Sequence, residues 1–81
     1  MTFAVEDRVK KVGGSYYHHI YGTISARWVA NDGTMRYSFV FDFPAGMVHI
    51  FSDSNLELMT PSDEINSSKI KAFLAELTDS N

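Results

Sequence analysis

Histidines are the residues with the widest chemical use in this chain of 81 residues, which contains His18, His19 and His49. His18 and His19 are adjacent, so in an extended segment their side chains point to opposite faces and do not reach one metal ion together. His49 stands by itself, and no carboxylate lies at a spacing that completes a metal site. The pattern favours surface or interface histidines, and we expect no metal site.

Serines, carboxylates and cysteines offer no catalytic pattern either. No serine stands in a Gly-x-Ser-x-Gly elbow, the turn that presents the nucleophile of many hydrolases. The paired acids Glu6-Asp7 and Asp63-Glu64 fall at predicted ends of elements, where turn and cap roles account for them. The chain has no cysteine, which excludes disulfides, zinc fingers and thiol catalysis. A reducing cytoplasm is the expected compartment.

A basic stretch near the N-terminus indicates anion binding. Arg8, Lys10 and Lys11 precede two neighbouring aromatic residues, Tyr16 and Tyr17. Aromatic faces beside cations suit stacking and phosphate contact in single-stranded nucleic acid. The alternative is a strand edge whose charges protect it from aggregation. Ten acids outnumber seven bases, giving a net charge of -3, so nucleic acid is not the favoured partner. Lys10, Lys11 and the two tyrosines stay candidates for binding a partner.

Five short strands are predicted to position these residues. Apolar residues that alternate, or form short runs between turn signals, mark strands at 7–12, 20–30, 35–42, 47–51 and 56–59. Residues 52–55 form a polar connection that suits one tight helical turn. Five short strands with tight turns predict a small, strongly bent barrel over residues 1–59.

Glycines predict the turns and a bulge, and the alternation of residues along the longest strand predicts which side chains share a face. Asp32-Gly33 predicts a tight hairpin turn, and Pro44-Ala45-Gly46 predicts a second turn. Gly22 is expected at a bulge. The period of two over 20–30 places Ile24, Ala26 and Trp28 on one face.

Residues 60–81 are predicted to form a helical extension of the same domain. Thr60 is a candidate cap, Pro61 suits the first helical position, and Ser67 is a second candidate cap. Helical spacing of four apolar residues predicts an amphipathic helix over about 67–77. Its apolar face is expected either to pack on the barrel or to pair between chains. The four residues are Ile70, Phe73, Leu74 and Leu77.

The segment 46–51, which reads Gly-Met-Val-His-Ile-Phe, is apolar on both faces when extended. Such a strand is expected where both faces are covered, and a barrel of this size cannot cover both faces by itself. We therefore expect a subunit interface here, and hence a homo-oligomer. No apolar stretch approaches the roughly 20 residues that cross a bilayer, so no membrane partner is expected.

Short motifs over about residues 5–59 also carry a family resemblance. They are Asp7-Arg8-Val9-Lys10-Lys11, Gly13-Gly14, Gly22-Thr23-Ile24, Asp32-Gly33, Tyr37, the segment 46–51 and Leu56-Glu57. Together they resemble the plasmid-borne, trimethoprim-resistant dihydrofolate reductases. The resemblance implies an SH3-like barrel that assembles as a homotetramer, with one active site in a central pore and NADPH as cofactor. The helical tail has no counterpart in that family.

The same resemblance implies roles for five residues. The pore strand of the family reads Val-Gln-Ile-Tyr, and a lysine of its first strand meets the acidic tail of folate and the phosphate of NADPH. The resemblance thus implies cofactor contacts for Lys11, Val48, His49 and Ile50, and catalytic positions for His49, Ile50 and Phe51. His49 keeps the hydrogen-bonding capacity of glutamine, and Phe51 keeps the aromatic face without the hydroxyl.

Two functional hypotheses follow. The leading one is a non-catalytic interaction module, whose exposed aromatic surface and strand 48–51 bind a protein partner without a cofactor. Nucleic acid is a less favoured partner of the same module. The alternative is an NADPH-dependent dihydrofolate reductase that holds cofactor and substrate together in a pore between subunits. Oligomeric state discriminates between the two, because such a pore does not exist in a monomer.

Overall fold

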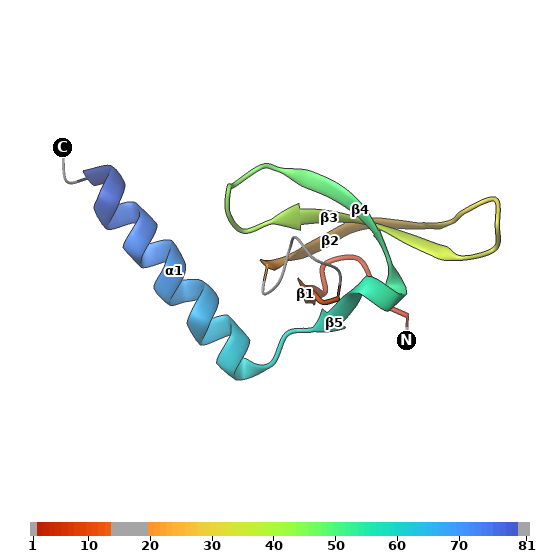
Figure 1. Cartoon of the computed structure of the whole chain (residues 1–81), viewed down its shortest axis with the longest axis horizontal. Coiled ribbons are helices and arrows are strands. Elements are labelled where there is room, and N and C mark those ends of the chain that lie inside the picture. Colours follow the sequence, from red (N-terminus) through yellow and green to blue (C-terminus); the bar gives the residue numbers. More distant parts are fainter. Residues whose placement is uncertain (1, 14–19, 80–81) are drawn as a thin grey trace.

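Five antiparallel strands in one sheet and a C-terminal helix make up the fold (Figure 1). The computed structural model describes residues 2–13 and 20–79. The strands are β1 (Arg8–Lys11), β2 (Ile20–Val29), β3 (Met35–Phe41), β4 (Val48–Ser52) and β5 (Leu56–Leu58). One turn of 3-10 helix, η1 (Asp53–Asn55), precedes β5, and the helix α1 spans Pro61–Asp79. The prediction of a mainly β fold with five strands, a tight helical turn and a C-terminal helix is confirmed.

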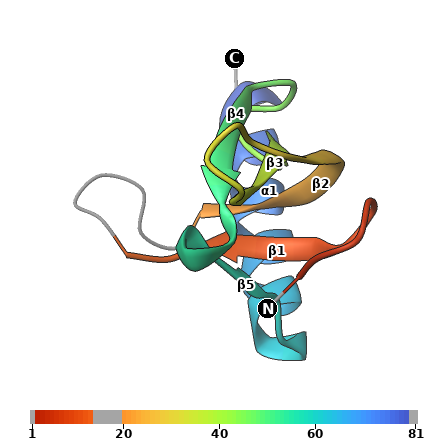
Figure 2. The same ribbon diagram turned by 90° about the vertical axis from the view of Figure 1, so that its right-hand side faces the viewer.

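The strand order β4-β3-β2-β1-β5 leaves β4 and β5 at the two edges of the sheet. Among the described residues no ladder joins these edges, so the sheet is open and closure into a barrel stays a prediction. The sheet is nevertheless strongly bent, and β1 and β4 run at a steep angle to each other (Figure 2). Lys11 Nζ on β1 lies 5.5 Å from the ring centroid of Phe51 on β4, although β2 and β3 separate these strands.

Aromatic rings dominate the core, which lies on one face of the sheet. Phe39 on β3 packs edge to face on Phe51 of β4 at a centroid distance of 5.5 Å. Phe3 packs edge to face on Tyr37 at 5.4 Å, and the Phe3 backbone N–H donates to the Tyr37 hydroxyl at 3.1 Å. Such ring pairs contribute about 0.5–1.5 kcal/mol beyond their burial. The buried core residues are Phe3, Val9, Ile24, Tyr37, Phe39, Phe41, Phe51 and Leu56.

The bulge in β2 lies between Ile24 and Ala26, where the register with β3 shifts, so the prediction of a bulge at Gly22 is wrong. The bulge also changes which residues share a face, because it shifts the period of two by one residue. Arg27, rather than Ala26 or Trp28, stands opposite the buried Tyr37. The shared face predicted for Ile24, Ala26 and Trp28 is therefore wrong beyond the bulge.

Gly22 instead allows β2 and β3 to lie close together. A Cβ atom there would lie 2.6 Å from Phe39 Cζ and would overlap the backbone oxygen of Val40. A side chain at this position thus collides with β3, the neighbouring strand.

Both predicted turns are present. Gly33 has a φ of 85°, which favours glycine, and its N–H donates to the Ala30 carbonyl at 2.9 Å in the turn between β2 and β3. The turn between β3 and β4 contains Pro44, whose peptide bond with Phe43 is cis, and Gly46. The hairpins β2–β3 and β3–β4 therefore follow the glycine positions of the sequence.

The helix α1 begins at the first of the two predicted caps. Thr60 Oγ1 accepts from the Asp63 N–H at 3.2 Å, and Asp63 Oδ2 accepts from the Thr60 N–H at 2.9 Å. This reciprocal pair caps the helix at Thr60, so the helix starts about two turns before Ser67. No helix in the described part of the chain combines the length and apolar character that crossing a membrane requires.

Candidate functional site

An ion-pair cluster around Arg8 joins the sheet to the helix. The guanidinium donates to both carboxylate oxygens of Asp42, each at 2.6 Å, and to Glu64 of α1 at 3.0 Å. Ser67 Oγ donates to Asp42 at 2.6 Å, and Arg8 Nη1 donates to Thr23 Oγ1 at 3.0 Å. Arg8 on β1 thus contacts three other segments: β2, the residue after β3 and the first turn of α1.

Lys10 makes the second contact between β1 and the helix. Its ammonium lies 2.9 Å from Asp63 Oδ2, the same oxygen that caps α1. Arg8 and Lys10 are therefore engaged with acids of this chain and do not form an unopposed basic patch for nucleic acid. β1 lies between β2 and β5, so the interpretation of the basic stretch as a protected strand edge is wrong.

These contacts shift the pKa values of the groups involved. The hydrogen bonds to Asp42 and Glu64 raise the pKa of Arg8 above its ordinary value. Burial raises the pKa of Asp42, but the hydrogen bonds from Arg8 and Ser67 outweigh burial and lower it overall. The pKa of Asp63 is lowered by the backbone hydrogen bond from Thr60 and then by Lys10. All three groups are thus held in their charged forms.

Lys11 lies on the core face of β1. It is buried, and its Nζ donates to the backbone oxygens of Gly13 at 2.7 Å and Val12 at 3.2 Å. Its cation lies over the ring of Phe51. The structure thus brings together two residues that the resemblance placed in one site. The other candidates of the basic region, Tyr16 and Tyr17, and also His18 and His19, lie outside the described residues.

The residues of β4 point to two different faces. His49 stacks with Phe51 at a centroid distance of 6.1 Å and lies 5.4 Å from the ring of Phe41. Val48 and Ile50 face the other side and are 50% and 60% exposed. Within one chain, Lys11, His49 and Phe51 therefore share a side, whereas Val48 and Ile50 are turned away from it. Among the described residues, no group of three His, Asp or Glu side chains is placed to hold a metal ion.

The outward face of β4 carries two exposed apolar side chains, Val48 and Ile50. β4 is an edge strand, with β3 as its neighbour on one side. The cross-strand partners of Val48 and Ile50 on β3 are Val40 and Ser38, which carry no charge. An apolar row beside an open strand edge can accept another strand.

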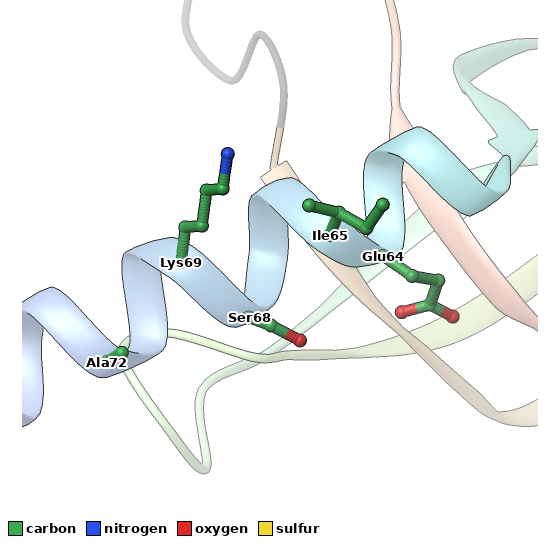
Figure 3. A pocket seen from close by; sticks show the side chains of 5 residues that line it. All are labelled: Glu64, Ile65, Ser68, Lys69 and Ala72. Atoms are coloured by element: carbon green, nitrogen blue, oxygen red, sulfur yellow. The ribbon is translucent and has the colours of Figure 1, made fainter.

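The depression on α1 is a weaker candidate. It encloses about 400 Å³ and lies on one side of the helix, opening to solvent (Figure 3). Glu64 supplies an acid and Lys69 a base to its walls, and the side chains of Ser68 and Lys69 point in different directions. The residues that line it are Glu64, Ile65, Ser68, Lys69 and Ala72.

Comparison with models of protein families, with characterised proteins and with solved structures gives no match for this chain.

Proposed function

We propose that this protein is an interaction module that binds an extended segment of a protein partner along β4. The observation that carries the proposal is the position of Val48 and Ile50, two exposed apolar side chains, on an edge strand. An added strand gains affinity from the backbone groups of the edge and specificity from alternate side chains. Binding of this kind needs no cofactor.

The chemistry of the edge defines the partner. A strand added to β4 places every second side chain on the face of Val48 and Ile50, so the partner segment should carry apolar residues at alternate positions. Charge should contribute little, because Val40 and Ser38, which flank this row on β3, are uncharged. A chain without cysteine suits a reducing compartment, and we propose the cytoplasm.

A displayed peptide library provides the probe for this proposal. Ile50→Lys puts a charge on the edge and should weaken binding of the selected peptides by about tenfold or more. The matched control is Val29→Lys, since Val29 is 63% exposed at the end of β2 and should tolerate the change. Peptide-induced amide shifts should cluster at residues 48–52. Equal loss of binding in both variants, or shifts confined to α1, would contradict the proposal.

A second candidate function is the reduction of dihydrofolate by NADPH in a pore formed by four copies. The observation that favours it is the grouping of Lys11, His49 and Phe51 on one side of the sheet. In the single chain, however, the Lys11 ammonium is bound by the carbonyls of Val12 and Gly13. An anionic ligand must displace those carbonyls before it can use the lysine.

Spectrophotometric measurement of NADPH oxidation with dihydrofolate tests the second candidate, together with bacterial growth under trimethoprim. Lys11→Ala should weaken binding of the anionic ligands more at low salt than at high salt, because the proposed contact is electrostatic. Lys71→Ala, at an exposed lysine, is the matched control. His49→Ala should instead lower turnover, because it is proposed to position the two rings. A confirmed tetramer without NADPH oxidation and without growth rescue rejects this candidate.

A further inference from the structure

The second half of α1 carries an apolar stripe that the sheet leaves exposed. The first turns of the helix are bound to the sheet through Asp63, Glu64 and Ser67. Beyond them the helix continues away from the strands (Figure 1). The exposed fractions along the stripe are Ile70 38%, Phe73 59%, Leu74 40% and Leu77 55%. Of the two arrangements expected for this face, packing on the sheet is therefore not the one that the chain adopts.

Charges beside the stripe indicate what covers it. Lys69 and Glu76 are seven residues apart, or about two turns, so they lie on the same flank of the stripe. In an antiparallel pair of identical helices, this flank of one helix lies beside the same flank of the other. Lys69 of each copy then lies opposite Glu76 of the other, which gives two complementary pairs. In a parallel pair, the flanking residue opposite Lys69 is Leu74, and no such charge pair forms.

We propose that α1 of a second copy covers this stripe, with the two helices antiparallel about a two-fold axis. Ile70 of each copy then packs against Phe73 of the other, as a self-complementary interface requires. Short helices pair poorly when they must also fold. Here Arg8 and Lys10 already anchor the first turns of each helix. Pairing therefore loses less conformational entropy, because part of each helix is ordered beforehand. This contact and the proposed partner at β4 occupy different elements, so one can exist without the other.

Sedimentation equilibrium of the full chain tests this contact. The concentration should run from about 10 μM to about 1 mM, because a small interface allows only a low affinity. We expect a reversible dimer. Ile70→Asp should raise its dissociation constant by about tenfold or more. Ile65→Asp is the matched control, because Ile65 is 56% exposed and lies off the stripe, and it should leave the dimer intact. A wild-type chain that stays monomeric at about 1 mM, or a dimer equally affected by both variants, overturns the proposal.

Cross-linking tests the antiparallel direction and is independent of the stability of the Ile70 variant. The chain has no cysteine of its own, so single cysteines report one contact at a time. A mixture of Lys69→Cys and Glu76→Cys proteins should form mixed disulfide dimers several-fold faster than either protein alone. Faster cross-linking of each variant with itself indicates a parallel pair and overturns the proposal.

Charge reversal provides the third readout. Lys69→Glu alone should weaken the dimer, since it places two like-charge pairs across the interface, and the double variant Lys69→Glu/Glu76→Lys should restore it. Failure of the double variant to recover the dimer contradicts the assigned register.

Discussion

Arg8 shows why the identity of a single side chain matters here. Its planar guanidinium binds both oxygens of Asp42 and still reaches Glu64, a geometry that a lysine ammonium cannot reproduce. Asp42 Oδ2, which accepts from Arg8 Nη2, also accepts a hydrogen bond from the Ser67 hydroxyl. These polar contacts, rather than apolar packing, set the position of the helix on the sheet.

Gly22 should be sensitive to even a small substitution. Alanine adds a single methyl group there, and we expect a large loss in the free energy of unfolding. Gly22→Ala places a methyl group against the Phe39 ring and the Val40 carbonyl, and should lower the free energy of unfolding by about 2–3 kcal/mol. Gly33→Ala is the matched control, because nothing lies within 4 Å of that position and the positive φ costs about 1–2 kcal/mol. Urea unfolding measures both changes. A smaller loss for Gly22→Ala than for Gly33→Ala would contradict the close approach between β2 and β3.

The helix α1 has two halves with different chemistry. Its first turns use the carboxylates of Asp63 and Glu64 to hold the cations of β1, while its later turns expose the apolar stripe. The acids at the helix start also complement the positive end of the helix dipole. Docking of α1 on the sheet is therefore electrostatic, which makes it sensitive to pH.

Acid is expected to detach α1 from the sheet. The pKa values of Asp42 and Asp63 are lowered in the folded protein, so their ionised forms stabilise the fold. That contribution is complete well above the ordinary carboxyl pKa of about 4 and is lost as the pH falls through the lowered values. The free energy of unfolding, measured by urea titration at several pH values, should therefore fall below about pH 4. Asp42→Asn should make this dependence shallower, and an unchanged slope would contradict the role of Asp42.

In the part of the chain that the structure describes, the apolar core belongs to the sheet. All its buried members come from the strands and from the segment containing Phe3, and none comes from α1. The helix gives the molecule its elongated shape, with extents of 48 × 25 × 23 Å. The sheet should therefore fold without the helix.

Removing residues 60–81 tests this division. The shortened chain should keep the β signal in circular dichroism, because its core is intact. It should melt about 5–15 °C lower, since the contacts of Arg8 with Glu64 and of Lys10 with Asp63 are lost. Its mass should be that of a monomer at concentrations where the full chain dimerises. An unchanged melting temperature and oligomer mass would show that the helix has no structural role.

Local features of the chain were predictable from the sequence. The five strands, the turn at Gly33 and the cap at Thr60 depend on residues close together along the chain, whose backbone preferences act within a few positions. The stripe on α1 was predictable for the same reason, because helical spacing defines a face before any packing occurs. The apolar character of segment 46–51 was also readable without the fold, and Val48 and Ile50 are exposed, whereas the interface expected there stays a prediction.

The tertiary structure decided which of these residues meet. The acidic partners of Arg8 are 34 and 56 residues away, and sequence periodicity carries no signal of such pairs. The same holds for Lys11 above Phe51, which requires the sheet to bend until β1 approaches β4. The bulge between Ile24 and Ala26 reversed the faces expected for the end of β2. A sequence defines faces and turns because they are local, whereas bending, register and ion pairing follow from how distant segments pack.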